Sequence, residues 1–294
     1  MGWYIGSFIG TFFSNATYWP LVNIKLKLSP IFNINKEVIR HSLSVAIPTI
    51  PHYYTNYLFE GSGRVVLDTY SVSQGEIGRI SISQQFGAIV SMGLTGVSNA
   101  IAPYALDALK RRDDSRIRKL FYGYVSISFL FIFMLAIWSK EIFFLLLSNK
   151  TLASSYNYFV LYIMAFCYRP IYVIVSYYYF FYEKTKNLLG ITFVSGLIAI
   201  ILYIVLTPLL GVWGFLIGHY IASLYYGYAG YFYKVYTSNT KKNLPIGFFF
   251  VLQFVLTLIS YLVVENLIIK IVFTVALAIF SLMILNKFKD VFKK

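Results

Sequence analysis

Long apolar stretches fill this chain, and short charged breaks separate them. Nine such stretches can be marked, at roughly 3–22, 43–66, 77–106, 119–139, 155–182, 187–207, 212–233, 245–264 and 267–286. A helix needs about 20 mostly apolar residues to cross the hydrocarbon layer, which is ~30 Å thick. The pattern therefore predicts an all-α integral membrane protein with about nine transmembrane helices.

Composition agrees, because 59% of the residues are hydrophobic and 12% are charged. The formal net charge of +14 does not indicate nucleic-acid binding, since the Lys and Arg residues lie in short clusters between the apolar stretches. Nineteen of them fall after the first, third, fifth and seventh stretches or in the tail, against four in the alternate connections. The positive-inside rule then predicts a bacterial inner-membrane protein with its N-terminus outside and its C-terminus in the cytoplasm.

No cofactor or metal site is predicted. The single cysteine, Cys167, lies in an apolar stretch, and the three histidines, His41, His52 and His219, fit no metal-ligand spacing. The predicted outer connections, such as 208–211, are too short for an extracytoplasmic catalytic domain. We therefore expect no enzyme activity.

Polar residues recur at every fourth position of the second stretch: His52, Asn56, Glu60 and Arg64. Each step drifts only ~40° around a helix, so they form one slanting polar stripe. Pro48 and Pro51 precede the stripe and predict a kink or break. In the plainer alternative, Glu60 and Arg64 are an ordinary i,i+4 ion pair near the outer surface.

A stripe of small and polar residues marks the third stretch: Ser83, Gly87, Ser91, Thr95 and Asn99. Small residues at this spacing let membrane helices approach closely, so helix packing is the favoured interpretation. The adjacent Gln84 and Gln85 point in different directions, and at least one is expected to face the interior.

The fifth stretch carries Arg169, followed by Pro170 and flanked on the same face by Tyr162 and Tyr172. A cation beside aromatic rings in a membrane can hold a phosphate while the rings stack on sugar. The alternative is a structural arginine held by backbone carbonyls at a Pro170 kink. His219 is expected to be packed rather than catalytic.

Two longer segments resemble a known family. They are AIPTIPHYYTNYLFEGSGRVVLDTY with the following GEIG, and YYYFFYEKTKNLLG with the following LTPLLGVWGFLIG. They are similar to polysaccharide flippases of the O-antigen transporter type, in the multidrug/oligosaccharidyl-lipid/polysaccharide exporter superfamily. Two positions depart from the family pattern: Gly63 replaces an acidic residue, and Arg79 replaces an apolar one.

The resemblance implies a two-lobed exporter fold of which this chain lacks the N-terminal helices. Residues 1–42 would then be a helix and cytoplasmic linker at the end of a missing lobe, and 43–235 the C-terminal six-helix lobe. Residues 236–294 would be two additional helices and a basic tail.

It also implies a function, the flipping of undecaprenyl-pyrophosphate-linked oligosaccharide for O-antigen, capsule or exopolysaccharide synthesis. Arg64 and Arg169 would contact phosphate, Tyr162 and Tyr172 would stack on sugar, and His52 and Glu60 are candidates for ion coupling. Expected partners are the lipid-linked oligosaccharide, anionic membrane lipids, and other glycan-assembly membrane proteins or a separate N-terminal half, with no nucleic acid.

Three alternatives stay open at this point. They are an integral-membrane glycan polymerase or glycosyltransferase, another exporter of the same superfamily, and a truncated nonfunctional remnant.

Overall fold

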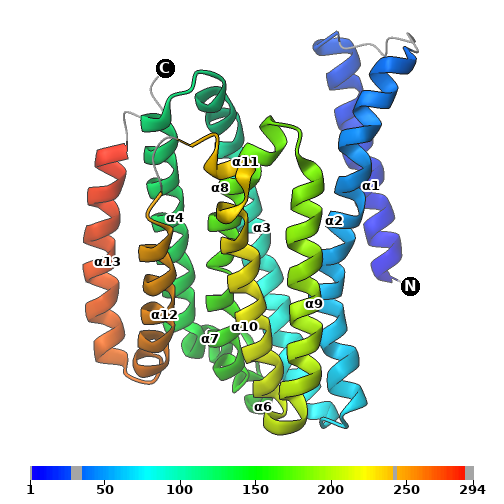
Figure 1. Cartoon of the computed structure of the whole chain (residues 1–294). Coiled ribbons are helices and arrows are strands. Elements are labelled where there is room, and N and C mark those ends of the chain that lie inside the picture. The colour runs from blue at the N-terminus through cyan, green and yellow to red at the C-terminus, as the bar shows by residue number, and fades with distance from the viewer. Residues whose placement is uncertain (1, 28–34, 241–243, 289–294) are drawn as a thin grey trace. The chain divides into compact units, whose positions relative to one another are not determined.

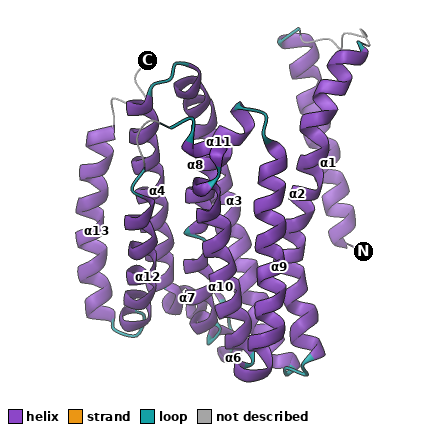
Figure 2. Ribbon diagram, viewed as in Figure 1, coloured by secondary structure: helices purple, strands orange, loops and turns teal. Residues whose placement is uncertain are grey.

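Helices joined by short loops and turns make up the described part of the protein (Figure 2). A computed structural model describes residues 2–27, 35–240 and 244–288, without the side chains of residues 2–3, 45, 48–49, 51–58, 60 and 278–288. Each of the nine stretches predicted from the sequence coincides with a helix or a pair of helices, and the described residues contain no strand. The chain divides into two compact units, residues 1–44 and 45–294.

The first unit contains α1 (Gly2–Pro20), a π-helical segment (Leu21–Lys25) and the beginning of α2 (Lys36–Thr69). The side chain of Asn35 accepts a hydrogen bond of 2.9 Å from the backbone N–H of Glu37 at the start of α2. α2 runs on as one helix to Thr69. Pro48 and Pro51 therefore do not break it, and of the predicted kink or break only the kink stays a prediction.

The second unit is a helix bundle built from the end of α2 and the elements that follow (Figure 1). These elements are α3 (Gln74–Lys110), α4 (Asp114–Ile137), α5 (Ser139–Leu146), α6 (Lys150–Ala153), α7 (Tyr156–Ala165), α8 (Tyr168–Phe181), α9 (Thr185–Leu210), α10 (Val212–Tyr228), a 3₁₀ turn (Ala229–Phe232), α11 (Lys234–Thr237), α12 (Ile246–Val263) and α13 (Leu267–Phe288).

Five segments in the described part of the chain are long and apolar enough to cross a membrane: Gln74–Lys110, Asp114–Ile137, Lys150–Phe181, Thr185–Leu210 and Ile246–Val263. The chain is thus an all-α, multi-pass membrane protein. Lys150–Phe181, which contains α7 and α8, is the central span, with 83% of its most apolar window buried. Only 17% of the most apolar window of α3 is buried, so much of that helix is exposed in this unit.

α9 and α10 pack closely at the turn that joins them, because that turn contains two glycines. Gly211 has a positive φ (58°, with ψ −134°) that glycine tolerates far better than other residues, three positions after Pro208. A Cβ on Gly214 would lie 2.2 Å from the backbone oxygen of Leu206, so only glycine fits this approach.

In the second unit, the basic loops lie together at one end of the bundle. In Figure 1 the α3–α4 and α8–α9 turns lie at one end, and the α2–α3, α9–α10 and α12–α13 turns lie at the other. The first group holds the basic clusters at 110–119 and 184–186. These are the loops that the sequence assigned to one side of the membrane, and the cytoplasmic location of that side stays a prediction.

Candidate functional site

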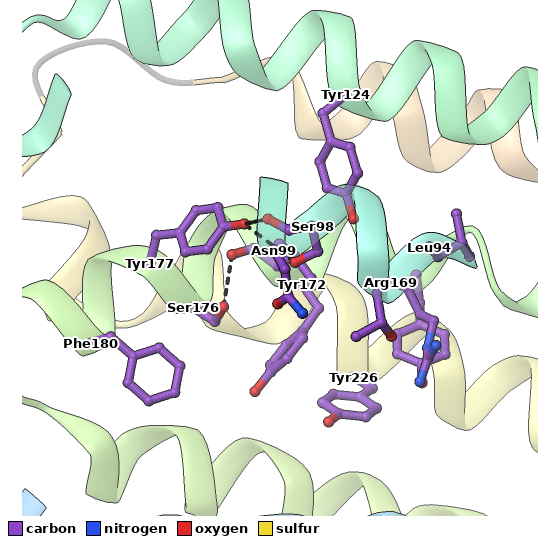
Figure 3. Close-up of a pocket in the computed structure, with 13 residues that line it drawn as sticks. Leu94, Ser98, Asn99, Tyr124, Arg169, Tyr172, Ser176, Tyr177, Phe180 and Tyr226 are labelled. Atoms are coloured by element: carbon purple, nitrogen blue, oxygen red, sulfur yellow. Dashed lines mark hydrogen bonds between the residues drawn. The ribbon is translucent and has the colours of Figure 1, made fainter. Parts of the chain in front are cut away.

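A half-open cavity of about 270 Å³ lies between four helices of the bundle. Leu94, Thr95, Ser98 and Asn99 of α3, Tyr124 of α4, Tyr226 of α10, and seven residues of α8 from Tyr168 to Phe180 line it. Figure 3 shows Arg169 at one end and Phe180 at the other, with Tyr172 and Tyr226 between them. The cavity is therefore long, aromatic and basic at one end.

Arg169 stands just after a break in the central span. α7 ends at Ala165 and α8 begins at Tyr168, and Pro170 lies in the first turn of α8. Proline has no N–H to give to the carbonyl of Phe166 four residues earlier, and the N–H of Arg169 bonds that carbonyl instead at 2.9 Å. The break thus keeps the backbone hydrogen-bonded at this depth in the membrane.

The guanidinium of Arg169 is held by α3. Its Nη1 donates to the backbone oxygen of Ser91 at 3.1 Å and also to the Ser91 hydroxyl. Its Nε donates to the Tyr168 hydroxyl at 3.5 Å, and the group lies 5.4 Å from the centre of the Phe166 ring. A backbone carbonyl does hold this arginine, as the structural alternative required, but it comes from α3. The same side chain also lines the cavity.

Tyrosines form much of the cavity wall. The ring of Tyr226 packs on Tyr168 at 4.9 Å and on Tyr172 at 4.6 Å between ring centres. The Tyr177 hydroxyl donates to the backbone oxygen of Ser98 at 2.8 Å. Five tyrosines line the cavity, and its described lining residues include no carboxylate. Any anionic group that enters therefore meets one cation, hydroxyls and ring edges, without a competing negative charge.

The structure brings together two of the four predicted substrate-binding residues, Arg169 and Tyr172. Tyr162 lies elsewhere, buried at 3% exposure with its ring stacked on His219 at 5.0 Å. His219 is packed as expected, since its Nδ1 lies 3.2 Å from the Tyr203 hydroxyl and its exposure is 1%.

Arg64 lies beside a second, open hollow of about 590 Å³ between α2 and α3. Asp68, Gln74 and Gln84 also line it. Gln84 thus faces a hollow, while its neighbour Gln85 is exposed. Arg64 and Arg169 do not share a cavity. The side chains of His52 and Glu60, the coupling candidates, lie outside the described residues.

The small-residue stripe of α3 has two roles along its length. Toward the N-terminal end, Ser83 donates to the backbone oxygen of Ser155 and Gly87 contacts the Tyr162 ring, which is the expected packing. Farther along, Ser91 holds Arg169, and Thr95 and Asn99 line the cavity.

Several lining residues were not predicted, notably Tyr124, Tyr177 and Tyr226. The chain contains 27 tyrosines, and no local pattern separates these three from the tyrosines expected at membrane interfaces. Only their contacts with helices distant in the sequence select them.

Comparison with known proteins gives one distant relative. The chain is 24% identical over 180 residues to "Lsg locus putative protein 1" of Haemophilus influenzae, a match covering 60% of this chain and 44% of that protein. The chain thus matches less than half of its relative's length. No family model and no solved structure matches the chain.

Proposed function

We propose that this chain takes part in moving undecaprenyl-pyrophosphate-linked oligosaccharide units across the bacterial inner membrane, and that it makes or breaks no covalent bond. The observation that carries the proposal is the cavity in which Arg169 and five tyrosines meet inside membrane-spanning helices. An arginine within a span is costly and is kept where it meets a partner or a polar ligand.

The chemistry of the lining supports such a substrate. A guanidinium offers donors in a planar fork that matches phosphate oxygens, and low local polarity strengthens those bonds. The half-buried Tyr172 brings its ring and hydroxyl to the cavity wall beside it, which suits a sugar that has an apolar face and a polar edge. The resemblance of the two sequence segments to polysaccharide flippases supplies the lipid-linked form of the substrate.

Substitution of Arg169 tests the proposal. Arg169→Gln should lower surface glycan display roughly ten- to hundred-fold, because charge-assisted hydrogen bonds to phosphate are lost. Arg169→Lys keeps the charge and should retain part of the display. Lys150→Gln, at an exposed position beyond the cavity, is the matched control and should change nothing. The measurement is surface glycan on cells, normalised to the amount of variant protein in the membrane.

The lipid-linked intermediates separate transport from enzyme activity. A transport defect leaves complete oligosaccharide units on undecaprenyl pyrophosphate inside the cell. A polymerase or glycosyltransferase defect leaves short chains or incomplete units. Unchanged display in Arg169→Gln, or accumulation of incomplete units, contradicts the proposal.

A further inference from the structure

A second polar cavity, of about 240 Å³, lies where three membrane-spanning segments end. Leu109 comes from the end of α3, Arg112 from the α3–α4 turn, Asp114 and Ile117 from the start of α4, and Tyr182 follows the end of α8. Ser238, Asn239 and Thr240, just after α11, complete it. Since the spans begin or end here, the cavity lies at the level of the lipid headgroups.

The described residues that line the cavity include one cation and one anion that do not pair with each other. Arg112 and Asp114 both line it, and no ion pair joins them within the described part of the chain. Their neighbours are engaged elsewhere, since Arg111 and Arg116 both bind Asp107. The Asp113 side chain accepts from the N–H of Arg116. Arg112 and Asp114 are thus two opposite charges available to one ligand.

Neutral polar groups surround the two charges. Ser238, Asn239 and Tyr182 bring hydroxyl and amide groups to the wall. Thr240 also lines the cavity, and its buried hydroxyl lies within reach of the Tyr178 and Tyr236 hydroxyls. The described wall thus adds polar groups and no further charge.

The inner wall of the cavity is apolar. Leu109 and Ile117 line both the cavity and a neighbouring gap of about 10 Å³, which is too small to hold an acyl chain. The polarity of the site therefore suits a lipid headgroup whose acyl chains stay in the bilayer.

We propose that this cavity binds the headgroup of a zwitterionic phospholipid of the phosphatidylethanolamine type. Its phosphate contacts Arg112, and its ammonium contacts Asp114. An anionic lipid without an amine places no cation near Asp114 and leaves that carboxylate next to the phosphate. The site therefore selects for a headgroup with both charges, which distinguishes it from the general attraction of basic loops to anionic lipid.

Lipid binding to the purified full-length chain tests this. The chain is prepared in detergent and titrated with phosphatidylethanolamine or phosphatidylglycerol of the same acyl chains, and bound lipid is counted by native mass spectrometry. We expect one tightly bound phosphatidylethanolamine. Asp114→Asn and Arg112→Gln should each weaken it at least about ten-fold, because each removes a charge-assisted contact.

Matched variants control for charge and folding. Arg112→Lys keeps the cation and should retain binding, whereas Lys119→Gln and Glu37→Gln each remove one exposed charge outside the cavity and should bind normally. Equal affinity for phosphatidylglycerol, or unchanged binding in both cavity variants, overturns the proposal. Full competition by soluble glycerophosphoethanolamine also overturns it, because the site would then take the free headgroup rather than a lipid.

Discussion

Gly87 and Tyr162 form one of the tightest contacts between α3 and α7. A Cβ at Gly87 would lie 2.4 Å from Cε1 of the Tyr162 ring, and the Phe166 ring is also in contact. The Tyr162 ring is in turn stacked on His219, so it has little room to move. The absence of a side chain at residue 87 therefore sets the distance between the two helices.

Substitution of this glycine should be costly. Gly87→Ala is expected to destabilise the protein by about 1–3 kcal/mol through overpacking, seen as a lower melting temperature in detergent. Gly93→Ala on the same helix is the control, since a Cβ at that position would have no atom within 4 Å and alanine is the better helix former. Equal effects of the two substitutions would show that the contact with Tyr162 does not set the packing.

Sequence spacing predicts neighbours only while the helix is continuous. Arg169 and Tyr172 are three residues apart within α8, and they line one cavity as the spacing indicates. Tyr162 is seven residues before Arg169, which would place it on the same face of an unbroken helix. The break between Ala165 and Tyr168 changes that phase, and Tyr162 turns instead toward His219.

At the scale of elements, two ion pairs join the α12–α13 hairpin to α5, close to its junction with α4. Lys140 binds Glu265 between α12 and α13, and Tyr156 donates to the same carboxylate. The next residue, Glu141, accepts from Nζ of Lys270 at 2.6 and 2.7 Å. Trp138 adds a hydrogen bond of 2.9 Å to Thr274.

The two pairs should differ in strength. The Lys270 side chain is fully buried, so Glu141→Gln leaves its charge without a counterion and should cost about 1–3 kcal/mol, allowing for the 38% exposure of Glu141. Lys140→Gln breaks the more exposed pair and should cost below about 1 kcal/mol. Thermal unfolding of the two variants in detergent measures the difference, and a larger loss for Lys140→Gln would reverse this ranking.

The stability contributed by the Lys140–Glu265 ion pair depends on pH in a defined direction. The hydrogen bond from Lys140 lowers the pKa of the Glu265 carboxyl below its ordinary value, and the same bond raises the pKa of Lys140. The stabilisation from Glu265 is present above the ordinary pKa of its carboxyl and is lost as the pH falls through its lowered pKa in the folded protein. The stabilisation from Lys140 is lost as the pH rises through the raised pKa of its ammonium group.

Helix positions were predictable, whereas the contacts that join helices were not. An apolar stretch identifies its helix from residues that are adjacent in sequence, and this is why the nine predicted stretches match helices. The pairing of Glu141 with Lys270 depends on residues 129 positions apart, and nothing near either residue indicates the other. The cavity wall is non-local for the same reason.

At the scale of the whole molecule, the charge asymmetry of the connections gives a testable orientation. Replacing the single cysteine, Cys167, by serine allows one new cysteine to be placed at a time. Ser148→Cys should react with a membrane-impermeant maleimide in intact spheroplasts, and Ser115→Cys should react only after permeabilisation, because the basic loops are expected to be cytoplasmic. The reverse pattern would invert the topology.

The Glu141–Lys270 pair also has a consequence for biosynthesis. Glu141 leaves the ribosome 129 residues before its partner, which is on the order of ten seconds at roughly 5–20 residues per second. During that interval α4 and α5 have no α13 to pair with, so the pair can form only after the α12–α13 hairpin has been made. Insertion of that hairpin is therefore a late step that closes this corner of the bundle.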